Sequence, residues 1–338
     1  MSKKLENSDR KALGSLISRI TFFIVIAGSA VFAFWPEGLD GSVFKDALSV
    51  ILATFPLMLL AILLIGWRLA ILSGREVSLR DGMAVNAVAQ LTALIVPSRL
   101  SEIAKPVGLN LIRNVPLSRG VTILAIERIF DAIFLAGLAL AAVAVLSGAY
   151  RQSIQTSGLI LAALAVAGLF IIGTILMRPR LLDALANWLP TQWLRNQIEH
   201  VAEAISRLAD PRTALLVFGL SAISWLAAYL IFAVFFLVLG IGALSQGEVL
   251  VVFVASTLGL IVSVAPGGLG TFEGAIALSL TAFDVPVGTA VAMALLLRLC
   301  LVIPVVAAAS WFLVSGDLSL SHVLGRLRNW RGTDERSA

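Results

Sequence analysis

Apolar segments long enough to cross a membrane recur along this chain, and they constrain its fold more than any other feature. A helix rises about 1.5 Å per residue, so about 20 apolar residues cross a hydrocarbon core of about 30 Å. Segments of this kind lie at residues 20–35 (a short one), 47–72, 119–146, 154–177, 214–239 and 287–314. Only 13% of the 338 residues are charged, against about 25% in soluble domains. The pattern excludes a soluble enzyme and predicts an all-α polytopic membrane protein.

Two further apolar segments are interrupted by short polar or glycine-rich motifs. The motif PSRLSE (residues 97–102) separates residues 82–96 from residues 103–112, and the motif APGGLG (residues 265–270) separates residues 249–264 from residues 271–283. Such backbone is stable at membrane depth only where protein or a water-filled cavity surrounds it. We therefore predict about six full transmembrane helices and two helical hairpins, either re-entrant or made of paired short crossings.

The positions of the basic residues predict the orientation. Lys and Arg concentrate in short cytoplasmic loops. The basic N-terminus (residues 1–19), the loop with Arg75 and Arg80, the segment 178–212 and the tail (residues 316–338) all fall on one side when six spans are counted. Both termini are therefore expected in the cytoplasm of a bacterial inner-membrane protein. Apolar residues in segment 178–212 recur at three- and four-residue steps, which predicts amphipathic helices at the membrane interface or, alternatively, a docking surface for a partner.

The single membrane domain (residues 20–315) is predicted to contain an inverted repeat. Two span–hairpin–span units, residues 47–146 and 214–314, insert in opposite orientations under this topology. The two hairpin motifs resemble each other, and a charged residue follows each proline at a similar distance: Glu127 lies 30 residues after Pro97, and Arg298 lies 32 residues after Pro266. Inverted repeats with broken helices that meet near the midplane are typical of secondary transporters.

Charged residues inside spans identify the candidate site, because they are costly there and are usually functional. Glu127 and Asp131 share one helix face, and Arg128 can pair with Asp131 at three-residue spacing. Arg298 reaches a similar depth from the opposite side, and Glu273 lies on the second hairpin. Two interpretations stay open, namely a buried ion-pair network that holds the bundle together and a cavity that binds a charged head group.

Both hairpin motifs precede a short helix, where free N–H groups and the helix dipole favour an anion such as a phosphate. Arginine suits bidentate phosphate contacts, and glycine allows close backbone approach, although glycines also serve helix packing. Asn86 and Gln90 either line the cavity or bond across helices, and we expect packing to be their role. The candidate substrate-binding residues are Arg99, Glu102, Glu127, Arg128, Asp131, Pro266, Gly267, Gly268, Gly270, Glu273 and Arg298.

Several other kinds of chemistry are not expected. Cys300 is the only cysteine, and His200 and His322 lie far apart, so neither a disulfide framework nor a metal site is predicted. The sequence has no P-loop pattern, and no cofactor is expected. The net charge of +5 is better explained by topology and by contacts with anionic lipid head groups than by nucleic acid.

The motifs PSRLSE (97–102), ERIFD (127–131) and PGGLGTFE (266–273), in this order, resemble the flippase-like membrane domain of lysylphosphatidylglycerol synthases over about residues 15–315. The first motif of that family usually reads PGRLGE; here Ser98 and Ser101 replace both glycines, whereas Arg99 and Glu102 are kept. The resemblance implies a lipid-translocating protein. Full synthases add a further membrane portion and a soluble aminoacyl-transferase domain, so we expect a stand-alone member without synthase activity.

The sequence therefore predicts a non-enzymatic carrier whose cargo is a membrane lipid, either a phospholipid or a polyprenyl-linked lipid, with an anionic or zwitterionic head group. A first alternative is a membrane partner of a lipid-modifying enzyme or glycosyltransferase that docks through residues 178–212. A second alternative is a membrane enzyme that uses Glu127 and Asp131 as an acid/base pair.

Overall fold

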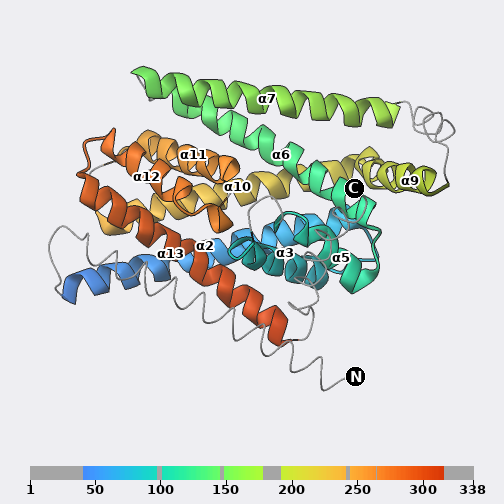
Figure 1. The fold of residues 1–338 in the computed structure, drawn as a ribbon, viewed down its shortest axis with the longest axis horizontal. Coiled ribbons are helices and arrows are strands. Elements are labelled where there is room, and N and C mark those ends of the chain that lie inside the picture. Colours follow the sequence, from blue (N-terminus) through green and yellow to red (C-terminus); the bar gives the residue numbers. More distant parts are fainter. Residues whose placement is uncertain are drawn as a thin grey trace, which may run out of the picture.

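A computed structural model describes residues 41–96, 101–144, 148–177, 192–240, 244–263 and 265–315 (Figure 1). The predicted first span, the N-terminus, the tail and the start of the first hairpin motif (residues 97–100) lie outside the described residues. The described residues form helices and turns. The helices are α2 (Gly41–Ser73), α3 (Leu79–Ala93), α5 (Ala104–Arg113), α6 (Leu117–Val143), α7 (Gly148–Met177), α9 (Gln192–Ser206), η1 (Arg207–Ala209), α10 (Pro211–Leu239), α11 (Gln246–Val262), η2 (Pro266–Gly268), α12 (Thr271–Thr281) and α13 (Val287–Val314).

Four described helices are long and apolar enough to cross a membrane: α2 from Lys45, α7 from Ile154, α10 and α13. The prediction of an all-helical membrane protein is thereby confirmed. Helix α6 has 27 residues, enough for about 40 Å, but four charged residues interrupt its apolar sequence. The predicted total of six spans stays a prediction, because the first of them is outside the described residues.

Helix ends follow local capping signals. Helix α10 begins at Pro211, and its N-cap Asp210 accepts hydrogen bonds from the N–H groups of Arg212 and Thr213. Hydrogen bonds from the hydroxyl and the N–H of Thr213 hold the pKa of Asp210 below its usual value. Helices α6 and α13 each follow a proline at the N-cap, and α13 matches the predicted span 287–314 at both ends.

The first arms of both hairpins begin three residues before the predicted positions. Helix α3 begins at Leu79 rather than at residue 82, and α11 begins at Gln246 rather than at residue 249. In each case a capping box, Ser78 with Asp81 or Ser245 with Glu248, starts the helix in polar sequence. The apolar pattern alone therefore missed the polar first turn.

The hairpin arms are short, as predicted. Helices α3 and α5 have 15 and 10 residues, and α11 and α12 have 17 and 11, so each is shorter than a bilayer core of about 30 Å. The arms of each hairpin contact each other. Figure 1 shows α3 and α5 at the right of the picture and α11 and α12 at the left.

The helices of the two predicted repeats pack against each other in matching pairs. The first helices, α2 and α10, are in extensive contact. Helix α3 packs on α13, and in the corresponding place α11 packs on α6. Helix α7 contacts α6 and α9 and forms one side of the molecule (Figure 1). These contacts bring both hairpins towards one central region.

The amphipathic pattern predicted for segment 178–212 is found in the part that the structure describes. Helix α9 packs against α6 and α7. Two residues of the predicted apolar stripe, Ile205 of α9 and Leu208 of η1, are buried in the core around α3 and α5. Arg119 of α6 holds α9 through an ion pair with Glu203 (3.0 Å). Part of the stripe therefore faces protein.

Two glycines allow α2 and α3 to cross closely. A Cβ atom on Gly66 would lie 2.6 Å from the Cα of Met83, and one on Gly82 would collide with the carbonyl oxygen of Gly66 and the Cβ of Ala70. A Gly82→Ala substitution is therefore expected to lower the free energy of unfolding by about 1–3 kcal/mol through overpacking, seen as a lower melting temperature in detergent. Gly137→Ala on α6, with no atom within 4 Å of its Cβ position, is the matched control; equal melting temperatures would contradict the close crossing.

Candidate functional site

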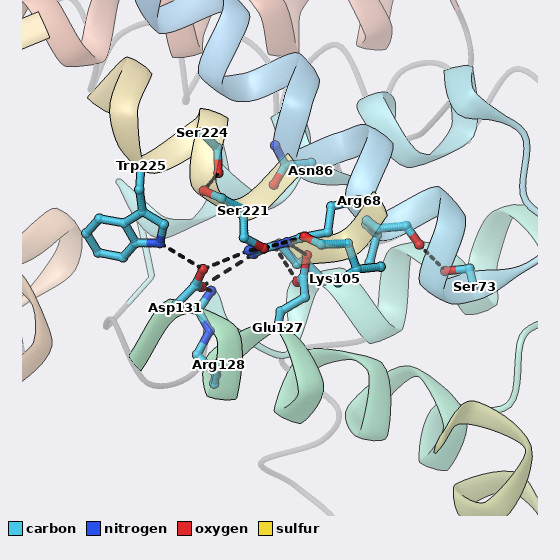
Figure 2. A network of polar contacts seen from close by, with 12 residues as sticks. Arg68, Ser73, Asn86, Lys105, Glu127, Arg128, Asp131, Ser221, Ser224 and Trp225 are labelled. Atoms are coloured by element: carbon cyan, nitrogen blue, oxygen red, sulfur yellow. Dashed lines mark hydrogen bonds and ion pairs between the residues drawn. The ribbon is translucent and has the colours of Figure 1, made fainter. Parts of the chain in front are cut away.

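Arg68 is the centre of a buried ionic network between α2, α6 and α10 (Figure 2). Its side chain lies within the membrane-spanning part of α2 and is almost fully buried. It donates hydrogen bonds from Nη1 to Asp131 Oδ1 (2.8 Å) and Ser221 Oγ (2.9 Å), and from Nε to Glu127 Oε1 (3.3 Å). A buried charge is tolerated only when such partners compensate for lost hydration.

Glu127 is completely enclosed by this network. Its exposed fraction is 0%, and its second oxygen accepts a hydrogen bond from Lys105 Nζ at 2.8 Å. Figure 2 shows Lys105 and Arg68 converging on Glu127 from the same side. Each carboxylate oxygen of Glu127 therefore has a cationic partner. This geometry supports the interpretation of Glu127 as part of a structural ion-pair network.

Asp131 and Arg128 form the more accessible side of the network. Asp131 accepts hydrogen bonds from Arg68 and from Trp225 Nε1 (3.3 Å). The predicted pair between Arg128 and Asp131 is confirmed at 3.4 Å, and the Arg128 side chain is 50% exposed. With every side chain counted as ionised, Arg68, Lys105 and Arg128 contribute three positive charges, and Glu127 and Asp131 contribute two negative ones, so the formal charge of the network is +1.

Arg298 organises the second hairpin. Its Nε donates to Glu273 Oε1 (2.7 Å), and its Nη1 and Nη2 donate to the carbonyl oxygens of Gly267 (2.7 Å) and Gly268 (3.3 Å). The guanidinium also lies over the ring of Phe272, 4.2 Å from its centroid, a cation–π contact. Arg298 is itself buried, so it fixes the turn from inside the protein.

The conformation of this turn explains its glycines and corrects one expectation. Gly267, Gly268 and Gly270 have φ values of 60°, 71° and 84°, which glycine adopts without strain. The N–H groups of Gly268, Leu269 and Gly270 donate to Ala265 O, Pro266 O and Glu273 Oε2. These N–H groups, expected to bind an anion, are thus engaged within the hairpin, and the turn presents carbonyl oxygens to Arg298.

A cavity of about 310 Å³ lies between the two hairpins and helices α6 and α13. Five of the predicted site residues line it: Glu102, Arg128, Gly267, Gly268 and Arg298. Lys105 lines it as well. We call this space the central cavity. The structure thus brings residues from both predicted repeats to one place, although they are far apart in the sequence.

The other predicted site residues lie around the central cavity or beyond the described parts. Glu127 is enclosed behind Lys105, and Glu273 is the partner of Arg298. Asp131 lines two neighbouring cavities. Pro266 and Gly270 belong to the turn but are not among the residues that line the cavity. Arg99 lies outside the described residues.

The two polar residues expected to serve packing, Asn86 and Gln90, both line one of the cavities next to the central cavity. Asn86 donates a hydrogen bond from Nδ2 to the carbonyl oxygen of Ile62 (2.9 Å), so the predicted bond between helices is confirmed. Gln90, one turn later, lines the central cavity. Gln90 therefore takes the other position considered for it, at the wall of the cavity.

Arg68 and Lys105 were missed by the sequence analysis. Arg68 is a charged residue inside the apolar segment 47–72, and Lys105 lies inside the short segment 103–112. The cost of a charge within a span, which identified Glu127, applies equally to Arg68. Arg68 lies towards the predicted cytoplasmic end of its segment, where a cation is usually attributed to topology. Lys105 lies at the other end of its segment, next to the polar break of the first hairpin.

Among the residues that the structure describes, no group of three or more His, Cys, Asp and Glu side chains is arranged to hold a metal ion.

Comparison with known proteins agrees with the family that the motifs indicate. The family model described as the lysylphosphatidylglycerol synthase TM region matches residues 14–309. No curated protein and no solved structure matches the chain. The matched region contains all the candidate site residues. The chain is a multi-pass membrane protein that belongs to the lysylphosphatidylglycerol synthase TM region family.

Proposed function

We propose that this protein carries a lipid with an anionic or zwitterionic head group across the bacterial inner membrane, and that the head group binds in the central cavity. The observation that supports this proposal best is the excess formal charge of +1 in the buried network. Arg128 presents this excess positive charge to the central cavity, because its side chain is half exposed and lines the cavity. Guanidinium groups in a weakly polar site favour phosphate-like anions.

Glu102 extends the proposal to zwitterionic head groups. It is exposed and lines the same cavity as Arg128. A phosphate near Arg128 and a cationic moiety near Glu102 would both find an opposite charge. The cargo class that fits is therefore a membrane phospholipid or a polyprenyl-linked lipid phosphate.

An inverted repeat forms part of the proposal, and two ion pairs support it. Lys105 lies 8 residues after Pro97, and Glu273 lies 7 residues after Pro266. Each pairs with the charged residue of the following long helix, at 2.8 Å for Lys105–Glu127 and 2.7 Å for Glu273–Arg298. The two pairs occupy matching positions with their charges exchanged.

The matching helix contacts also support this relation, since α3 packs on α13 as α11 packs on α6. Two related halves around one central site are the arrangement on which alternating access depends. We further infer that both termini are cytoplasmic, from the distribution of basic residues.

A non-enzymatic role fits these contacts better than acid/base catalysis. Both oxygens of Glu127 accept from cations, and the residue has no exposed surface. A general base must instead be within hydrogen-bond reach of its substrate. The matched family model describes the membrane region alone, which is consistent with this role.

The test is translocation of fluorescent (NBD-labelled) phosphatidylglycerol in proteoliposomes, followed by dithionite quenching. Arg128→Gln is expected to slow translocation about tenfold or more, because a charge-assisted hydrogen bond in a buried site contributes about 1.5–3 kcal/mol. Arg212→Gln, an exposed arginine at the start of α10, is the control and should retain the wild-type rate. A wild-type rate for Arg128→Gln would refute the proposed site.

A further inference from the structure

A second cavity continues from the central cavity towards the outer surface of the helix bundle. Its volume is about 520 Å³, and it shares Glu102, Arg128 and Leu260 with the central cavity. Its remaining wall is formed by side chains of α6, α7, α10 and α11. We call it the lateral groove. Because Arg128 lines both spaces, a ligand held by its guanidinium has access to both.

The two ends of the lateral groove differ in polarity. Arg128, Asp131 and Trp225 lie at its inner end, where they belong to the ionic network. Leu164 of α7 and Ile261 of α11 form the outer end and are 62% and 56% exposed. In a membrane protein, exposed apolar side chains on such helices face lipid hydrocarbon. The groove therefore connects a charged site with the hydrocarbon of the bilayer.

The position of the opening follows from how tightly α6 and α7 pack. A Cβ atom on Gly158 would lie 3.1 Å from the Cβ of Ala139, and one on Gly168 would lie 2.7 Å from the Cδ1 of Ile129. These two glycines of α7 bring the helices into close contact and leave no room between them. The groove consequently opens between the α6–α7 pair and α11.

We propose that the lateral groove holds a hydrocarbon chain of the same lipid whose head group binds near Arg128. This inference rests on the proposed function and narrows its substrate class to a lipid whose head group carries a net negative charge and lies directly next to its chains. Lipid tails are as apolar as leucine, so burying a tail here yields little free energy. The groove acts as a passage that keeps the tail in apolar surroundings while the head group leaves the membrane surface.

The proposal can be tested by photocrosslinking at the outer end of the groove. A benzophenone amino acid replaces Ile261, and the full chain is reconstituted in phosphatidylcholine liposomes with trace clickable phosphatidylglycerol or trace clickable phosphatidylcholine. The same replacement at Ile160 of α7, which has the same exposed fraction of 56% and does not line the groove, is the matched control for lipids that merely surround the protein.

The expected result is an enrichment of phosphatidylglycerol over phosphatidylcholine at position 261 of about tenfold, corresponding to about 1.4 kcal/mol of head-group preference, and no enrichment at position 160. Arg128→Gln should remove this enrichment. Ala132→Phe should remove it as well, because Ala132 lines the lateral groove but neither the central cavity nor the other neighbouring cavity that Asp131 lines. Ala141→Phe, an exposed position farther along the same helix, should leave it unchanged.

The outcomes separate this inference from the proposed function. Equal crosslinking of both lipids at position 261, or enrichment that survives Arg128→Gln, overturns the groove as the tail passage, whether or not Arg128→Gln slows translocation. A slow Arg128→Gln variant without enrichment at position 261 leaves the head-group site in place and removes only the groove. If Ala132→Phe does not fold, the comparison of positions 261 and 160 with Arg128→Gln decides the question.

Discussion

Glu127→Ala is expected to lower the free energy of unfolding by about 3–5 kcal/mol, the typical effect of removing one partner from a buried ion pair. Glu127 is 0% exposed and accepts hydrogen bonds from both Arg68 and Lys105. Without it, Lys105 loses the carboxylate that it contacts, and Arg68 retains Asp131 and Ser221. The measurement is chemical or thermal unfolding of the purified protein in detergent, with helix content as the signal.

The control is Glu102→Ala, which removes an exposed carboxylate of the same charge and should change stability by less than about 0.5 kcal/mol. A double variant, Lys105→Met with Glu127→Gln, should be more stable than the sum of the single effects predicts, by about 0.5–3 kcal/mol, because the two side chains are in direct contact. Additive effects, or a stable Glu127→Ala variant, would show that the ion pair contributes little to the fold.

Arg298→Gln is expected to reduce translocation of NBD-labelled phosphatidylglycerol to the rate of protein-free liposomes. Arg298 holds Glu273 and two carbonyl oxygens of the glycine turn at the same time, and both glycines line the central cavity. Loss of three charge-assisted hydrogen bonds, each contributing about 1.5–3 kcal/mol, releases this wall of the site. Arg298→Lys should recover the rate only in part, since an ammonium group cannot reproduce the planar guanidinium geometry.

Thermal unfolding distinguishes a defect of the site from a failure to fold. Glu273 is 15% exposed and can therefore be hydrated when its partner is lost, so Arg298→Gln should reduce stability less than Glu127→Ala. Translocation at the wild-type rate in a folded Arg298→Gln variant would contradict a role for the turn. Full recovery by Arg298→Lys would show that charge matters and geometry does not.

Much of the helical architecture is predictable from apolar runs and prolines. The last span agrees with α13 at both ends because Pro286 starts the helix and polar sequence follows it. The hairpin arms were recognised from their length and from the motifs that interrupt them. Their first turns were missed because Ser78 and Ser245 begin the helices in polar sequence through capping boxes, a local signal that hydrophobicity does not contain.

The site was predictable only where contacts are local. The Arg128–Asp131 pair follows from three-residue spacing, whereas Arg68 contacts Glu127 across 59 residues and Arg298 contacts Glu273 across 25. Those partners depend on how α2, α12 and α13 pack, which no local pattern specifies. The glycine turn was recognised, but the direction of its peptide groups depends on φ and ψ, and these direct its carbonyl oxygens to Arg298.

The ion pairs around the central cavity have a consequence for how the two proposed units are joined. Arg68 and Lys105 bind carboxylates within the first unit, and Arg298 binds one within the second. Between the units, the network is joined by neutral donors and acceptors: Arg68 donates to Ser221, and Trp225 donates to Asp131. A rigid-body rotation about the α2–α10 contact would therefore break bonds of about 0.5–3 kcal/mol each while every one of these salt bridges stays intact. The salt bridges of the network therefore do not by themselves fix the two proposed units relative to each other.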